Sequence, residues 1–306
     1  MKWNEILKSL NDKTIFLDMI EKKIDLKKED SVFTIGSCFV REIEDGLSDI
    51  LDFPVTKYIG IKEETFAGRS RGILNKFTPY SISRELNWVK NVENVTEKLF
   101  ENSLDIFKYQ IDEKKIIDIG LHMPLPVTIE RFINRRLNIL EIYKQINKSK
   151  LIIITLGNIE THNLKDGRVL ESITTNSNFL KNELKDIYVS KLDNEEVLEE
   201  LKKIVKLIKH FNKEAKIIFS VSPIPMARND FGNHIVLENF YNKTILVNNV
   251  KHVCSELNDV YYFPSFEFVN FLGIVAFEDD LRHVKKSVID LIIEGFKKMS
   301  GLTNNN

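Results

Sequence analysis

The sequence predicts an α/β fold: a three-layer α/β/α sandwich around a mostly parallel sheet of about five strands. Short apolar runs that are bounded by polar or turn-forming residues are typical of strands buried on both faces. Four such runs occur: Val32–Gly36, Leu151–Leu156, Lys216–Val221 and Val260–Phe263. Long helical patterns separate them, and strands that alternate with helices indicate a parallel sheet with helices on both faces.

The helical patterns belong to a main domain that we expect to span residues 31–300. They cover residues 39–51, 79–90, 129–148, 193–212, 238–257 and 284–299. Residues 1–30 are charged and partly helical in pattern, so we expect a helical appendage at the N-terminus. Residues 53–58 are a candidate for one further strand.

Two less regular regions are expected to be insertions in this domain, near residues 92–127 and 160–192. In the first, a small hairpin is favoured from Ile111 to Ile119, because the Asp112-Glu113-Lys114 segment between them is turn-forming. The second region is polar and favours a cap or a loop.

Composition excludes several classes of protein. With 306 residues, 43% of them apolar, the chain can bury a sizeable core as one large domain or two smaller ones. A net charge of −1 argues against a broad basic surface, so no nucleic acid partner is expected. We find no signal peptide and no apolar segment long enough to span a membrane. The two cysteines, Cys38 and Cys254, argue against a disulfide scaffold and favour a cytoplasmic location.

The motifs that hold metals and nucleotide cofactors are missing from the sequence. There is no CxxC pair, HExxH motif or paired-histidine spacing, so no metal site is expected. There is also no GxGxxG or GxxxxGK[ST] phosphate loop, so no cofactor is expected.

The first candidate for chemistry is Ser37. The predicted strand Val32–Gly36 breaks at Gly36-Ser37 and passes directly into a helical pattern. This order puts the Ser37 hydroxyl at the carboxyl end of the sheet, with backbone N–H groups of a helix N-terminus beside it. Both features suit a nucleophile and the negative charge that its attack develops. A Gly-Ser turn that serves geometry alone is the alternative, and these residues by themselves leave it open.

The second candidate is the pair Asp280 and His283, just before the last predicted helix. Side chains three residues apart lie on one face of a helical turn, where a carboxylate can orient an imidazole and stabilise its protonated form. Because this loop follows the last strand, it should share the carboxyl edge of the sheet with Ser37. The alternative is a surface acidic turn with a capping histidine.

Seven short segments, in order along residues 30–290, resemble the GSCFA family, a branch of the SGNH hydrolase-like superfamily. The segment Gly36-Ser37-Cys38-Phe39-Val40 is similar to the motif that names the family, with Val40 in place of the final alanine. The other segments are residues 72–74 with 79–82, 118–122, 155–157, 221–225, 262–267 and 280–283. The resemblance implies that the sandwich is SGNH hydrolase-like, with a flavodoxin-like strand order.

By position, the resemblance implies that Ser37 is the nucleophile, His283 the base and Asp280 the group that orients it. Backbone N–H groups of Ser37 or Cys38, and of Gly72, would bind the oxyanion. The wider fold adds an asparagine from a Gly-x-Asn block, and the nearest match here is Asn158. Asn158 directly follows a glycine, so it stands one position early.

His122 and His162 complete the candidate site as substrate-binding residues. His122 belongs to a segment that resembles the family, and its alternative role is packing in a loop. His162 follows the predicted strand Leu151–Leu156, and its alternative role is that of a solvated loop residue. Cys38 stands next to the nucleophile and could attack in its place, although a small buried cysteine is more often a packing residue.

The resemblance implies a serine-dependent acyl-ester hydrolase or acyl (acetyl) transferase that acts on a glycan or polysaccharide-related substrate in a bacterial setting. Such chemistry needs no metal or organic cofactor. Two other classes stay open. One is a non-catalytic glycan-binding or scaffold protein, which the displaced Asn158 favours. The other is a metal-dependent sugar-nucleotide transferase that would use the acidic residues 278–280.

Overall fold

The computed structural model describes residues 15–48, 50–51, 60–65, 70–171, 187–229 and 231–302. In this part of the chain, the central sheet is parallel and consists of β1 (Val32–Gly36), β4 (Leu151–Leu156), β8 (Lys216–Val221) and β9 (Val260–Phe263). The spatial order is β1-β4-β8-β9. The four predicted strands are therefore confirmed. The candidate strand at residues 53–58 lies outside the described residues, so the sheet has four described strands where about five were expected.

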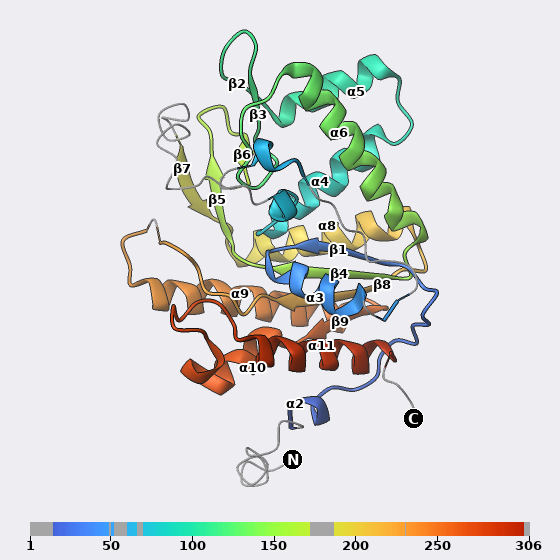
Figure 1. Ribbon diagram of the computed structural model, residues 1–306, viewed down its shortest axis with the longest axis vertical. Helices are drawn as coiled ribbons and strands as arrows, with labels where there is room; N and C mark the ends of the chain where they lie inside the picture. Colours follow the sequence, from blue (N-terminus) through green and yellow to red (C-terminus); the bar gives the residue numbers. More distant parts are fainter. Residues whose placement is uncertain are drawn as a thin grey trace.

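Helices cover both faces of this sheet (Figure 1). On one face lie α3 (Phe39–Ser48) and α11 (Lys286–Ser300). The other face is covered by α4 (Pro79–Val92), α6 (Ile129–Tyr143), α8 (Asn194–Phe211) and α9 (Ile235–Glu256). Each layer of helices has its own hydrophobic core against the sheet. The α/β/α sandwich predicted from the sequence is thus confirmed.

Strand β4 explains why the central strands are apolar throughout. Ile152 and Ile154 face the core beneath α4, α6 and α8, whereas Leu151 and Ile153 face the core beneath α3 and α11. Successive side chains of a strand point to opposite faces. Because helices cover both faces here, every position of β4 is buried, and the alternation that marks a half-exposed strand is lost.

The helix boundaries differ from the predicted ones at several ends. The pattern at 129–148 becomes α6 followed by the 3-10 helix η5 (Lys144–Lys148). Helix α9 begins earlier, at Ile235, where the His234 side chain caps it. Two short helices were not predicted: α5 (Glu97–Ser103) and α10 (Ser265–Leu272). Both span fewer than three turns, so periodicity gives a weak signal for them.

The two irregular regions contain strands. The hairpin consists of β2 (Lys108–Gln110) and β3 (Ile116–Asp118), so it starts slightly before the predicted bounds. Asp112 forms its turn by accepting hydrogen bonds from the N–H groups of residues 114 and 115.

The second irregular region, near residues 160–192, contains a three-stranded antiparallel sheet where a cap or a loop was predicted. It is formed by β5 (Glu160–Asn163), β6 (Val169–Leu170) and β7 (Tyr188–Lys191). Residues 172–186, between β6 and β7, lie outside the described part. The strands have only two to four residues each, so the sequence signal for them is weak.

The described part of the N-terminal segment packs against the main body. After α2 (Ile15–Asp18) the chain runs along the end of α11, where the N–H groups of Ile24 and Leu26 bond to the carbonyls of residues 299 and 300. Phe16 stacks on Phe268 with ring centroids 3.7 Å apart. Residues 1–14, the rest of the expected appendage, lie outside the described part. Among the helices described, none has the length and apolar character needed to span a membrane.

Candidate active site

The turn after β1 can be formed only with glycine at position 36. Gly36 has a φ of +143°, a conformation that residues with a side chain rarely adopt. A Cβ atom there would overlap the Thr155 carbonyl oxygen and lie 2.6 Å from the Thr155 Oγ1. Gly36 therefore lets β1 run directly against β4 and then turn sharply into α3.

Ser37 is held at this turn by Thr155, the residue that pairs with Gly36 in the β1–β4 register. The Ser37 N–H donates to the Thr155 carbonyl at 3.0 Å, and the Ser37 Oγ lies 3.0 Å from the Thr155 Oγ1. The Ser37 side chain is buried. A Cβ added to Gly157 would lie 3.3 Å from the Ser37 Cβ, so this second glycine leaves space beside the hydroxyl.

These contacts narrow the choice of oxyanion donors. The Ser37 N–H is already used in the sheet, so it is a poor candidate, and the expectation of Ser37 or Cys38 reduces to Cys38. The Cys38 N–H forms no hydrogen bond with a backbone carbonyl among the described residues. The Asn158 Oδ1 accepts from the Ile159 N–H at 2.8 Å and from the Asn242 Nδ2 at 3.0 Å. Because both bonds are made by the amide oxygen, they hold the Asn158 side chain in place through that atom.

Gly72 lies in a segment that docks onto the same turn. The Lys76 N–H donates to the Gly36 carbonyl at 2.8 Å, and the Asn75 N–H donates to Gly72 at 2.9 Å. His122 joins this segment, since its N–H donates to the Ile73 carbonyl at 2.9 Å. A Cβ on Gly72 would lie 3.9 Å from His122 Cδ2. The structure thus groups Gly72 and His122 next to the end of β1.

Asp280 and His283 form a self-contained turn over residues 277–284, which a bridge between Phe277 and Val284 closes. The Glu278 N–H donates to the His283 carbonyl at 2.7 Å. The Asp280 Oδ1 accepts from the backbone N–H groups of Arg282 and His283, each at 2.9 Å, and its Oδ2 bonds to the His283 Nδ1. These hydrogen bonds hold the pKa of Asp280 well below its usual range, and those from His283 have the largest effect. A carboxylate on Nδ1 fixes the tautomer that leaves Nε2 as the proton acceptor.

Arg282 connects this turn with the loop after β8, since its Nε donates to the Pro225 carbonyl at 3.4 Å. Burial raises the pKa of the Cys38 thiol, and the positive charge of Arg282 acts in the opposite direction. Ser37 and His283 are not hydrogen-bonded to each other: the Ser37 hydroxyl rests on Thr155, and the His283 side chain is 64% exposed.

His162 is placed with a different neighbour. It lies in β5, where its Nε2 is 2.8 Å from a guanidinium nitrogen of Arg228, in the loop after β8. Its ring is half-buried. The Cys38 thiol is also an unfavourable nucleophile, because burial raises its pKa and so disfavours the thiolate.

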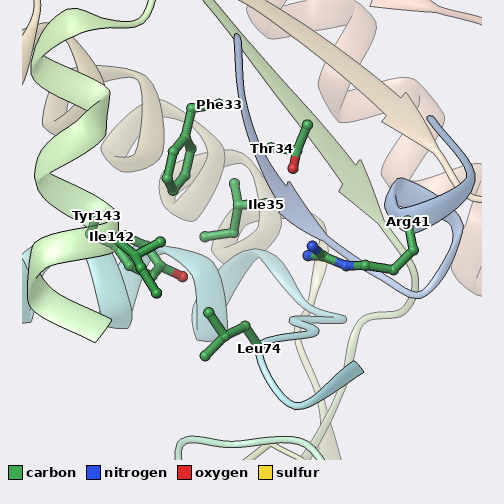
Figure 2. A pocket seen from close by; sticks show the side chains of 7 residues that line it. All are labelled: Phe33, Thr34, Ile35, Arg41, Leu74, Ile142 and Tyr143. Atoms are coloured by element: carbon green, nitrogen blue, oxygen red, sulfur yellow. The ribbon is translucent and has the colours of Figure 1, made fainter. Parts of the chain in front are cut away.

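A small pocket against β1 does not coincide with these residues. Figure 2 shows the seven side chains that line it: Phe33, Thr34, Ile35, Arg41, Leu74, Ile142 and Tyr143. Neither Ser37 nor His283 is among them, since the pocket lies along the middle of the strand. Arg41 closes its end by donating from Nε to the Asn75 Oδ1 at 3.2 Å. We therefore assign this pocket no part in the reaction.

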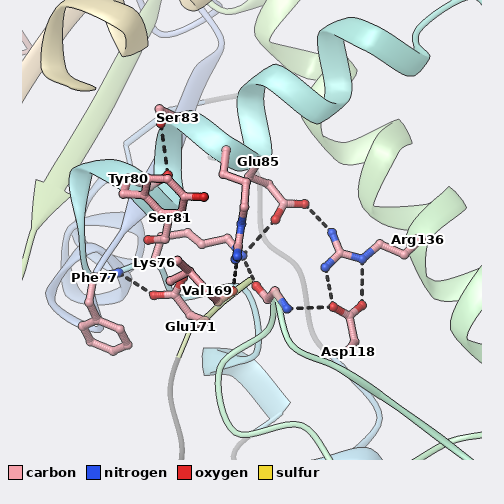
Figure 3. Close-up of polar contacts among 12 residues, drawn as sticks. Lys76, Phe77, Tyr80, Ser81, Ser83, Glu85, Asp118, Arg136, Val169 and Glu171 are labelled. Atoms are coloured by element: carbon pink, nitrogen blue, oxygen red, sulfur yellow. Dashed lines mark hydrogen bonds and ion pairs between the residues drawn. The ribbon is translucent and has the colours of Figure 1, made fainter. Parts of the chain in front are cut away.

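A buried ionic network supports the segment that contains Gly72 (Figure 3). Lys76 pairs with Glu85 at 3.0 Å, and Glu85 pairs with Arg136 at 2.6 Å. Arg136 also binds both oxygens of Asp118. All four side chains are at most 1% exposed, so breaking any pair would leave a buried charge without its partner. The network fixes this segment against α4, α6 and β3.

Sequence reasoning missed two residues close to Ser37. Thr155 is the only hydroxyl in the apolar strand β4, and its register partner is Gly36. Lys243 lies on α9, is 1% exposed and donates from Nζ to the Gly157 carbonyl at 2.7 Å. A lysine at a position that helical periodicity places on the buried face of a helix is a signal in the sequence, because lysine is almost never fully buried unless it is paired.

The acidic residues 278–280 do not form part of a metal cluster. Asp280 is engaged by its own turn, as described above. Across the ranges of the chain that the structure describes, no group of three or more potential ligands could hold a metal ion.

One of three comparisons with known proteins identifies the family. Residues 31–296 match the model of the GSCFA family. A search of curated proteins found no match to the sequence. Among solved structures, a carbohydrate esterase family 3 protein from Talaromyces cellulolyticus aligns with a TM-score of 0.36 at 12% identity, covering 87% of this chain and 94% of that one. An acetyl esterase mutant with acetate ion aligns with a TM-score of 0.38 at 10% identity, covering 90% and 100%. Likenesses as weak as these say nothing about the reaction.

Proposed function

Because the chain belongs to the GSCFA family, we propose that it is a serine-dependent acyl-ester hydrolase or acyltransferase in which Ser37 attacks the ester. The substrate in this proposal is an acylated, typically acetylated, glycan. His283 is the general base, and Asp280 orients it. The Cys38 N–H, the Gly72 N–H and the Asn158 Nδ2 are the donors to the oxyanion.

In the first half of the reaction, the Ser37 Oγ forms a bond to the ester carbonyl carbon while its proton passes to the His283 Nε2. The carbonyl oxygen becomes an oxyanion that N–H donors stabilise. Collapse of this intermediate breaks the bond to the leaving alcohol, which takes the proton from His283. In the second half, water or a sugar hydroxyl loses its proton to His283 and attacks the acyl carbon. The bond from that carbon to the Ser37 Oγ then breaks, and His283 returns the proton to Ser37.

The observation that carries the proposal is the bonding of Asp280. Its carboxylate holds the His283 Nδ1 and at the same time accepts two backbone N–H groups, so the imidazole is oriented before substrate arrives. The charge of Arg282, which lowers the pKa of the Cys38 thiol against the larger effect of burial, supports placing this turn near Ser37. For the proton to move, the Ser37 hydroxyl must rotate away from Thr155 toward His283, and such bonds often tighten only when substrate binds.

Labelling with a fluorophosphonate probe tests the nucleophile. We expect a covalent adduct on Ser37 in the wild-type protein, located by mass spectrometry of the labelled peptide. Ser37→Ala should lose the label and at least about 10³-fold in kcat on an aryl acetate. The matched variant Cys38→Ala should keep both, since the thiol has no part in the mechanism. Retention of label and turnover in Ser37→Ala would contradict the proposal.

Hydrolysis and acyl transfer use the same residues and differ in the acceptor. The two reactions can be separated by incubating the protein with a labelled acetyl ester, with and without a soluble glycan. Free acetate alone indicates hydrolysis, and acetylated glycan indicates transfer. If the protein binds the glycan but Ser37 never reacts, the scaffold alternative is the better one.

A further inference from the structure

Lys243 is a buried cation next to the proposed nucleophile. It lies on α9, and its Nζ donates to the carbonyl of Gly157 at 2.7 Å. Gly157 is the residue whose added Cβ would lie 3.3 Å from the Ser37 Cβ. The Lys243 ammonium and the Ser37 side chain therefore both adjoin Gly157.

The inward face of α9 changes character at this point. In the second half of the helix, Leu246, Val250 and Val253 are buried as core residues. In the first half, Asn242 and Lys243 are buried in the same direction. At the carboxyl edge of the sheet, two polar residues thus occupy buried positions that apolar residues would otherwise fill. Burial of polar groups weakens the hydrophobic core unless these groups have another role.

Comparison with Lys76 shows how unusual Lys243 is. Both lysines are almost fully buried. Lys76 pairs with the carboxylate of Glu85 at 3.0 Å. No carboxylate of the described residues forms an ion pair with Lys243, and its one hydrogen-bond acceptor there is the Gly157 carbonyl. A buried charge without a counter-ion is costly, and such groups are concentrated at functional sites.

Burial lowers the pKa of Lys243 to about 7. The groups around it come from several elements. From the β1–α3 turn, the Cys38 thiol interacts electrostatically with the Lys243 ammonium, and the charge of Arg282, in the 277–284 turn, acts on the same thiol. From β5, Glu160 accepts a hydrogen bond from Asn242, the neighbour of Lys243 on α9. Lys243 is thus cationic below neutral pH and neutral above it.

We propose that Lys243 is a positioning residue of the Ser37 site, whose ammonium holds the Gly157–Asn158 segment against Ser37 and adds positive charge where the oxyanion forms. This inference rests on the proposed function. A charged donor binds a carbonyl more strongly than a neutral amine does, so protonated Lys243 fixes Gly157 and, through it, Asn158. A fixed positive charge in a site with little water also stabilises developing negative charge.

The pH dependence of kcat tests this role. In the wild type we expect kcat to fall as pH rises through about 7 and Lys243 becomes neutral, which is the alkaline fall of the profile. Lys243→Met should lower kcat about 10-fold with little change in KM, and the alkaline fall should disappear. Lys243→Arg should keep most of the rate and also lose the alkaline fall, because a guanidinium stays charged. Lys251→Met, an exposed lysine on the same helix, should match the wild type.

A purely structural role predicts a different outcome. Variants of Lys243 would then lose stability while the alkaline fall of kcat stayed near pH 7, and this result would overturn the inference. If Lys243→Met does not fold, Lys243→Arg decides, because an alkaline fall retained in that variant overturns it equally. Fluorophosphonate labelling separates the two proposals: absence of label on wild-type Ser37 rejects the proposed function, whereas normal labelling with unchanged pH profiles rejects only the role of Lys243.

Discussion

The two turns that carry the proposed chemistry are built in opposite ways. The β1–α3 turn is buried and depends on residues far away in sequence: Ser37 bonds to Thr155, 118 positions later. The 277–284 turn is largely exposed and depends on itself, since Asp280 bonds to His283 three positions later. The first turn is determined by the sheet, and the second by local hydrogen bonds.

This contrast indicates how each turn responds to change. The position of Ser37 is over-determined by close packing, so a change there affects the fold as well as the reaction. The position of His283 relies on one carboxylate in a solvated loop, so a change there should affect the reaction with little effect on stability. Variants in the two turns should therefore separate activity from stability.

The largest effect on activity should come from His283→Ala. Without the imidazole no group takes the proton of Ser37, so kcat on an aryl acetate should fall by about 10⁴-fold or more, a loss similar to that of Ser37→Ala. Circular dichroism and the unfolding midpoint should match the wild type, because the side chain is exposed. Near-native turnover in the folded variant would place the base elsewhere, with His122 the next candidate.

Asp280→Asn should have a smaller effect, of about 10²-fold to 10⁴-fold in kcat. The amide can occupy the site but cannot stabilise the imidazolium. The lowered pKa of Asp280 keeps the carboxylate ionised as pH falls through the usual range of a carboxyl group. We therefore expect the ratio of wild-type kcat to variant kcat to stay constant as pH falls through that range. A ratio that falls toward 1 there would show that Asp280 is protonated and that His283 does not hold its carboxylate.

Gly36→Ala tests the buried turn through stability. The positive φ and the overlap with Thr155 should together lower the free energy of unfolding by about 3 kcal/mol or more, measured by urea denaturation. Gly167→Ala is the matched control, because Gly167 also has a positive φ, +83°, but open space around it. It should cost about 1 kcal/mol. Equal losses in the two variants would mean that contact with Thr155 is unimportant.

The smallest effect should come from removing divalent metal ions. Since the mechanism uses side chains and backbone N–H groups alone, treatment with EDTA should leave kcat unchanged. Loss of turnover that Mg²⁺ or Mn²⁺ restores would favour the transferase alternative and its use of the acidic residues 278–280.

The sequence by itself determined the central sheet and the local pairing in the exposed turn. Strands buried on both faces are continuous apolar runs, so β1, β4, β8 and β9 were predicted with their observed bounds. The contact between Asp280 and His283 was also predictable, because three-residue spacing in a turn brings side chains together whatever the rest of the chain does.

Only the tertiary structure decided what surrounds Ser37. Thr155, Gly157 and Lys243 come from β4, the turn after it and α9, and no spacing rule relates them to position 37. The same holds for the antiparallel sheet β5–β7, whose strands are too short for periodicity to indicate them. Contacts of this kind depend on how the helices and strands pack, and the free energy that selects them is shared among many residues distant in sequence.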